Sequence, residues 1–253
     1  YTTARQIKEE IYGKRLVLFA PLYLSNRCIN SCSYCGFSNR NTSSGKRLLE
    51  MQEISDETKA LISQGHKRLL LVSAEDPEVS IDYLQDAIKT VYETNEGNGA
   101  IRRINVNVAP MEESDFKKLK STGIGTYQSF QETYPTDTYK QLHTSGPKSD
   151  YLKRLYACDN AQSAGIDDVG IGALFGLHDY KYEVLAILFH AIHLEEVFGV
   201  GPHTISVPRL EPAQGSEIAS HPPSKVSDNE FKKIIAGLRL SVPYTGIILS
   251  TRE

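Results

Sequence analysis

The chain has 253 residues, of which 40% are hydrophobic and 23% charged, and its formal net charge is −3. This length can bury one large core and suits a single α/β barrel, and the charge balance shows no basic excess for binding nucleic acid. No apolar run approaches the roughly 20 residues of a membrane helix, and no secretory signal pattern opens the chain. We therefore expect a globular protein that neither crosses a membrane nor binds nucleic acid.

The first predicted elements are a short helix over residues 3–11 and a strand over residues 15–24. The strand is a nearly continuous apolar run, which is typical of a strand buried on both faces. Helix and strand patterns then alternate along the chain. Helices are predicted over residues 51–64, 81–95, 112–121, 150–163, 183–197 and 228–240. Strands are predicted over residues 68–73, 101–108, 126–131, 169–174, 203–207 and 246–250.

This alternation predicts parallel strands joined by right-handed crossovers, that is, an α/β fold. With the first strand, the pattern contains seven strands, and the sequence ends where the seventh would deliver its loop. We therefore expect a TIM-like (β/α) barrel that is truncated before its last strand–helix unit. In such barrels the loops after the strands carry the chemistry.

The loop after the first predicted strand holds three of the four cysteines, Cys28, Cys32 and Cys35, in the spacing CxxxCxxC. Thiolates this close together can bind one soft metal centre from a single loop. Zinc would usually take four protein ligands, whereas Cys158 lies far along the chain and is expected to pack as a small hydrophobe. Three thiolates suit a [4Fe–4S] cluster with one open iron, and such a cluster predicts a reducing, anaerobic cytoplasm. A degenerate zinc knuckle or a chance grouping is the alternative.

The aromatic Tyr34 directly before the third cysteine makes the motif similar to the signature of the radical S-adenosylmethionine (SAM) enzymes. The resemblance implies two cofactors, a [4Fe–4S] cluster and SAM, with Tyr34 at the cofactor site. It also implies that the amino and carboxylate groups of SAM chelate the open iron. Electron transfer from the cluster then cleaves SAM to a 5′-deoxyadenosyl radical.

Further stretches resemble the tyrosine lyases of this superfamily, which comprise the HydG-type maturases of [FeFe]-hydrogenase and the ThiH-type 2-iminoacetate synthases of thiamine thiazole synthesis. These stretches are residues 7–13, 19–23, 130–134, 164–170, 199–210, 242–246 and 249–253. Residues 202–206 and 243–246 favour the HydG type. We accordingly interpret residues 1–253 as one radical SAM barrel domain.

The resemblance implies cleavage of the tyrosine Cα–Cβ bond to p-cresol and dehydroglycine. HydG-type enzymes turn dehydroglycine into carbon monoxide and cyanide for the hydrogenase cofactor, the H-cluster, at a second cluster held by a C-terminal extension that this sequence lacks. ThiH-type enzymes deliver it to a thiazole synthase. The expected partners are L-tyrosine, a reductant such as flavodoxin or ferredoxin, and other hydrogenase maturases. A non-catalytic alternative is an iron–sulfur scaffold that carries a cluster to a partner.

The resemblance also assigns residues to SAM. Ala74 and Glu75, after the second strand, are expected to bind its methionine amino group. Glu132 after the fourth strand and Arg154 on the following helix are expected to hold SAM as an acid and a base, because the guanidinium fork binds both oxygens of a carboxylate. The alternatives are a loop carboxylate that faces solvent and a solvated helix arginine.

Two arginines are candidates for binding the tyrosine carboxylate. Arg209 and Arg252 each follow an apolar strand, where a side chain would point into the barrel mouth. A buried arginine needs an anion, and the substrate carboxylate would supply one. The alternative is a salt bridge that ties strands together.

Overall fold

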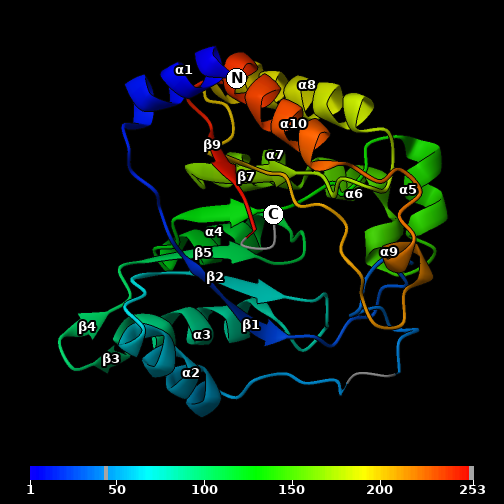
Figure 1. The fold of residues 1–253 in the computed structure, drawn as a ribbon. Coiled ribbons are helices and arrows are strands. Elements are labelled where there is room, and N and C mark those ends of the chain that lie inside the picture. Colours follow the sequence, from blue (N-terminus) through cyan, green and yellow to red (C-terminus); the bar gives the residue numbers. More distant parts are fainter. Residues whose placement is uncertain (43–44, 251–253) are drawn as a thin grey trace.

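The computed structural model describes residues 1–42 and 45–250 (Figure 1). Its centre is a seven-stranded sheet in which all neighbouring strands are parallel and follow one another in chain order. The strands are β1 Ala20–Ser25, β2 Arg68–Ser73, β5 Arg103–Asn107, β6 Thr126–Gln128, β7 Asp168–Gly172, β8 Thr204–Ser206 and β9 Gly246–Ile248. Because each crossover advances by one strand in the same direction, the sheet curls like the wall of a barrel, with β1 and β9 as its two edges. The predicted TIM-like α/β fold is confirmed.

Helices cover the outer side of this curled sheet (Figure 1). The longer ones are α1 Thr2–Tyr12, α2 Met51–Ser63, α3 Ile81–Glu93, α4 Glu113–Ser121, α8 Tyr180–Phe198 and α10 Asp228–Ser241. The short ones are α5 Thr136–Leu142, the 3₁₀ turn η1 Pro147–Ser149, α6 Tyr151–Leu155, α7 Ala157–Ser163 and α9 Glu217–Ser220. Local sequence sets several helix starts, since Ser80, Asp150 and Ser227 each accept a backbone N–H from the first turn. No helix in the described residues is both long and apolar enough to cross a membrane.

The apolar core lies between the sheet and the helices. Tyr127 on β6 packs edge-on against Phe116 of α4, with ring centroids 4.8 Å apart, and both side chains are fully buried. Because side chains alternate along a strand, the next residues face the other way. The strand register places Asn107, Gln128 and Thr204 in one row across β5, β6 and β8. This row on the concave face of the sheet is therefore polar, which suits a binding site more than a packed interior.

Several predicted boundaries were wrong. The first strand begins at Ala20 instead of residue 15, and Leu16, Val17 and Leu18 are 80%, 62% and 68% exposed. In the described residues no neighbouring strand pairs with this segment, so its apolar side chains are not covered. The predicted helix over residues 150–163 is broken at Tyr156 into α6 and α7. A small hairpin, β3 Asn95–Glu96 with β4 Gly99–Ala100, was not predicted.

Candidate active site

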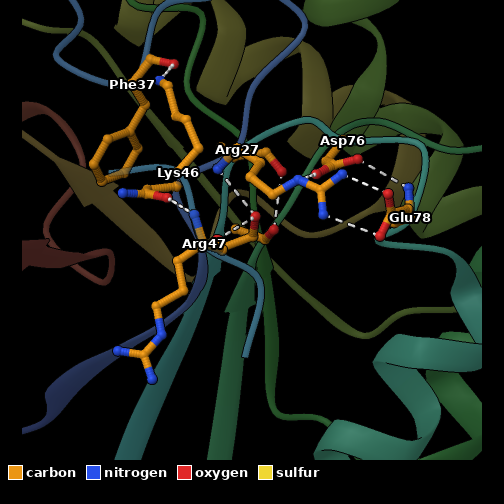
Figure 2. A network of polar contacts seen from close by, with 10 residues as sticks. Arg27, Phe37, Lys46, Arg47, Asp76 and Glu78 are labelled. Carbon is orange, nitrogen blue, oxygen red and sulfur yellow. Dashed lines mark hydrogen bonds and ion pairs between the residues drawn. The ribbon is translucent and has the colours of Figure 1, made fainter. Parts of the chain in front are cut away.

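The cysteine loop leaves the carboxyl end of β1 and is tied to the segment after β2. Arg27, directly before the first cysteine, forms an ion pair through Nε with Asp76 Oδ2 at 2.9 Å (Figure 2). Its Nη1 donates to Glu78 Oε2 at 3.0 Å. The Arg27 guanidinium thus fixes the start of the cysteine loop to two carboxylates after β2. The planar guanidinium, with several N–H donors, allows it to contact both at once.

The far end of the same loop folds back onto its beginning. The backbone N–H of Arg47 donates to Asn26 Oδ1 at 2.6 Å, and the Lys46 ammonium donates to the carbonyl of Phe37 at 2.9 Å (Figure 2). These contacts hold Lys46 and Arg47 against Phe37 and Asn26 at the carboxyl end of β1. The three cysteines are therefore held at the edge of the sheet where barrel enzymes carry their chemistry.

Tyr34, a residue of the cysteine loop, has a buried side chain that contacts the end of α5. Its hydroxyl lies 2.9 Å from Nε2 of His143, and Nδ1 of that ring lies 2.8 Å from the carbonyl oxygen of Tyr139. Burial lowers the pKa of His143 to about 4, so the imidazole is neutral. Since a carbonyl can only accept, Nδ1 carries the proton and Nε2 accepts from the Tyr34 hydroxyl. This bond orients the loop between Cys32 and Cys35, and direct contact of Tyr34 with a cofactor stays a prediction.

The three thiols of the loop fit an iron–sulfur cluster. Cys28, Cys32 and Cys35 are free, and burial raises the pKa of Cys32 to about 11 and that of Cys35 above its usual value. Thiols must lose their protons to bind metal, and the positive charge of bound iron favours the thiolates. In the described part of the chain no three His, Cys, Asp or Glu side chains are arranged to hold a single metal ion. The thiolates of a cubane bind different irons and need not converge on one point, so the donor set suits a cluster better than zinc.

Glu132 and Arg154, predicted on separate elements, are brought together after β6. Lys148 Nζ lies 2.7 Å from Glu132 Oε1, and Arg154 Nε donates to the carbonyl of Phe130 at 2.9 Å. Burial alone would raise the pKa of Glu132, but the Lys148 and Arg154 cations outweigh it and hold this pKa below its usual value. The carboxylate is therefore ionised between two cations.

The backbone at Glu132 is unusual. With φ of 68°, Glu132 is the one non-glycine residue with positive φ among those that the structure describes. The conformation is held by an N–H from Leu174 to the Glu132 carbonyl at 2.8 Å. Backbone strain of this kind clusters at functional sites, because it can hold a side chain in the orientation that a ligand needs before the ligand binds.

Sequence reasoning missed Lys148. It lies in the 3₁₀ turn η1, outside any periodic element, directly after Gly146 and Pro147. The positive φ of Gly146, 88°, marks a tight turn, but nothing in the sequence indicates that the turn reaches Glu132.

Ala74 and Glu75 lie beside the cysteine loop. The N–H of Ile29 donates to the Glu75 carbonyl at 2.9 Å, and the side-chain amide of Asn30 donates to the Glu75 carboxylate at 2.8 Å. Both Ala74 and Glu75 line a cavity of about 160 Å³ that also reaches Met111 after β5. This position is consistent with the expected contact to SAM, which stays a prediction.

The two arginines proposed for the substrate have different outcomes. Arg209 pairs with Asp228 at the start of α10, at 2.7 Å, and lies over the ring of Phe231, 4.7 Å from its centroid. A salt bridge is therefore present, although it joins Arg209 to a helix and does not tie two strands together, and a role for Arg209 in substrate binding stays a prediction. Arg252 lies outside the described residues.

Comparison with known proteins identifies the class. The family model "Radical SAM superfamily" matches residues 22–191, and the model "Biotin and Thiamin Synthesis associated domain" matches residues 206–253. The first match covers more than half of the chain and includes the cysteine loop, Glu75, Glu132 and Lys148. The chain belongs to the radical SAM superfamily, whose cofactors are a [4Fe–4S] cluster and SAM.

Individual relatives narrow the comparison. A crystal structure of HydG, described as a maturase of the [FeFe]-hydrogenase, is 56% identical over the whole chain, with a TM-score of 0.97. HydG from Carboxydothermus hydrogenoformans is 52% identical, also over the whole chain, with a TM-score of 0.93. The 2-iminoacetate synthase of Escherichia coli K12 is 32% identical over 99% of the chain. The chain spans 55%, 58% and 64% of the length of these three proteins, respectively.

Proposed function

We propose that this chain is the catalytic barrel of a HydG-type tyrosine lyase. It cleaves the Cα–Cβ bond of L-tyrosine to p-cresol and dehydroglycine, as the first step toward carbon monoxide and cyanide for the H-cluster of [FeFe]-hydrogenase. The observation that carries this proposal is the 56% identity and TM-score of 0.97 to HydG over the whole chain.

When bound, the cluster and SAM supply one-electron chemistry that removes a hydrogen atom from the substrate. The chain's own part is to hold and orient these groups. Cys28, Cys32 and Cys35 hold the cluster through thiolates, and Glu75 and Glu132 offer carboxylates to the polar end of SAM. The ionised state of Glu132 supports this role, because a carboxylate can then bind an ammonium or ribose hydroxyls.

The polar row on the concave face supports an amino-acid substrate. Gln128 is 1% exposed, and neither of its amide atoms has a hydrogen-bond partner among the described residues. Within the same part of the chain, the hydroxyl oxygen of Thr204 in this row also has none. Buried polar atoms are normally paired, so a polar group of the substrate, such as its phenol hydroxyl, would supply the missing bonds. Arg252 remains the proposed partner of the substrate carboxylate.

We assign only tyrosine cleavage to these residues, as one barrel domain. Carbon monoxide and cyanide formation, on the family resemblance, needs a second cluster held by further cysteines. After Cys35 the sequence contains only Cys158, which is 1% exposed in the apolar core, where burial raises its pKa to about 12. One buried thiol cannot hold a cluster that takes three or four thiolates.

A second candidate is the 2-iminoacetate synthase activity, supported by the 32% identity to the Escherichia coli enzyme. It shares the cleavage step and differs in the fate of dehydroglycine. We further propose a small electron-transfer protein, such as flavodoxin or ferredoxin, as the reductant, and other hydrogenase maturases as partners.

The test is a single anaerobic reaction of the reconstituted chain with SAM, a reductant and tyrosine. p-Cresol is measured by chromatography and carbon monoxide by trapping on haem. We expect p-cresol together with 5′-deoxyadenosine and no carbon monoxide. Absence of 5′-deoxyadenosine from a cluster-loaded chain would favour the carrier alternative, and stoichiometric carbon monoxide would show that the second reaction also lies within the barrel. Cyanide detection with the full-length protein distinguishes the HydG type from the ThiH type.

A further inference from the structure

Asn30, between the first two cysteines of the loop, is 1% exposed and hydrogen-bonds in three directions. Its side-chain Nδ2 donates to Glu75 Oε2 at 2.8 Å, and its Oδ1 accepts from the backbone N–H of Lys148 at 2.8 Å. Its backbone N–H and its Nδ2 lie 3.4 Å and 3.6 Å from the Cys28 sulfur. One buried amide thus contacts a cluster thiol, a carboxylate after β2 and the turn after α5.

The surroundings of Asn30 are shaped for this contact. Gly146 has φ of 88°, and a Cβ built on it would lie 2.4 Å from Asn30 Oδ1 and 2.9 Å from Asn30 Cα. A side chain at position 146 would therefore displace Asn30, so glycine is required there for steric reasons as well as for its backbone conformation. On the other side, the N–H of Asn39 donates to the Asn30 carbonyl at 2.9 Å.

These contacts have a physical consequence for a cluster on Cys28. N–H donors to a ligating sulfur stabilise negative charge on the cluster, and reduction adds negative charge, so they raise the reduction potential. Residues that hydrogen-bond to metal ligands orient them and tune the metal in the same way. The Asn30 amide also fixes the direction of the Glu75 carboxylate, since a hydrogen bond to an ionised group is strong and directional.

We propose that Asn30 is a positioning residue that couples the two cofactors of this enzyme. Through Cys28 it raises the reduction potential of the cluster, and through Glu75 it aligns the carboxylate that receives SAM. The proposal depends on the cluster and SAM and is independent of tyrosine as the substrate.

The principal test compares Asn30→Leu with the parent chain, both reconstituted anaerobically to four irons. Cluster potential is measured by redox titration followed by electron paramagnetic resonance, and SAM affinity by equilibrium dialysis. We expect a lower potential, and SAM binding weakened about 10–100-fold through loss of the hydrogen bond to the Glu75 carboxylate. Asn39→Ala is the matched control, because its amide contacts the carbonyl of Ile29 and the hydroxyl of Ser31 but neither a cysteine sulfur nor Glu75. We expect this control to keep both values.

Two further variants separate the donor role from support of the loop. Asn30→Asp keeps an acceptor for the Lys148 N–H but loses the donor and places a second carboxylate beside Glu75, so both the potential and SAM affinity should fall. Gly146→Ala leaves Asn30 intact but displaces it, and should shift both values in the same direction.

Parent-like potentials and SAM affinities in Asn30→Leu and Gly146→Ala would overturn the proposal, as would equal shifts in Asn39→Ala. Neither readout contains tyrosine. The variants can show the expected shifts even if the parent chain forms no p-cresol. That result would refute the proposed lyase function and leave this inference standing.

Discussion

Lys148 Nζ lies 2.7 Å from Glu132 Oε1, and the two side chains are only 14% and 13% exposed. The pair joins the turn after α5 to the end of β6 beside the cysteine loop. Both charges have left water, so removing one partner leaves the other buried without its nearest opposite charge.

We therefore predict that Lys148→Met lowers the free energy of unfolding by about 3 kcal/mol, the low end of the usual range, because Arg154 remains near Glu132. Urea denaturation under anaerobic conditions measures it. The control is Lys153→Met, whose partner Glu112 lies 3.9 Å away and whose side chain is 43% exposed; its effect should stay within about 1 kcal/mol. Adding Glu132→Gln to Lys148→Met should recover part of the loss. Equal effects of the two lysine variants would contradict this view of the pair.

A second prediction concerns pH. Glu183 on α8 is 0% exposed, and burial raises its pKa to about 7, although it accepts hydrogen bonds from the Thr133 hydroxyl and the Tyr134 N–H. The folded protein keeps this proton up to about pH 7, whereas the unfolded chain loses it near 4.5. Stability from this group is thus full below pH 4.5 and is lost as pH rises to 7, by about 3 kcal/mol in all.

The measurement is the urea midpoint of the reduced chain at several values between pH 5 and 8. Glu183→Gln cannot ionise and should flatten the decline across this range. Glu195→Gln, on the exposed side of the same helix, should leave the decline as in the parent. An unchanged slope in Glu183→Gln would show that another group causes it.

The cysteines provide a third prediction. Replacement of Cys28, Cys32 or Cys35 by Ala should abolish iron loading and SAM cleavage, because two thiolates cannot hold the cluster. Cys158→Ala should retain both, since this thiol is buried in the apolar core. Iron content and 5′-deoxyadenosine formation are the readouts. Full activity of Cys32→Ala would refute the assignment of the cluster ligands.

The fourth prediction separates the two arginines. Arg252→Lys keeps the charge but loses the bidentate fork, so the KM for tyrosine should rise about tenfold while SAM affinity stays unchanged. Arg209→Lys can still pair with Asp228, whose side chain is 82% exposed, and should change stability by less than about 1 kcal/mol. If instead Arg209→Lys raised the KM and Arg252→Lys did not, the two roles would be reversed.

Local pattern was sufficient for much of the fold. The alternation of helix and strand predicted every long helix and all seven strands of the sheet, because periodic burial leaves a mark in the sequence itself. It erred at residues 15–19, which are apolar apart from Arg15 yet do not pair with a strand in the described structure. An apolar run records a preference for burial, whereas a strand also requires a neighbour.

The candidate site divides in the same way. The spacing of Cys28, Cys32 and Cys35 is set covalently within one loop, so the sequence by itself determined the cluster ligands that we propose. Lys148 and Asn30 were not predicted, although they lie 2.7 Å and 2.8 Å from the acids Glu132 and Glu75. Asn30 and Lys148 are 118 residues apart in the chain and meet through one backbone hydrogen bond. Only the tertiary structure decided that Lys148 faces Glu132 and Asn30 faces Glu75. Contacts between distant loops depend on the curl of the whole sheet and leave no periodic signal in either segment.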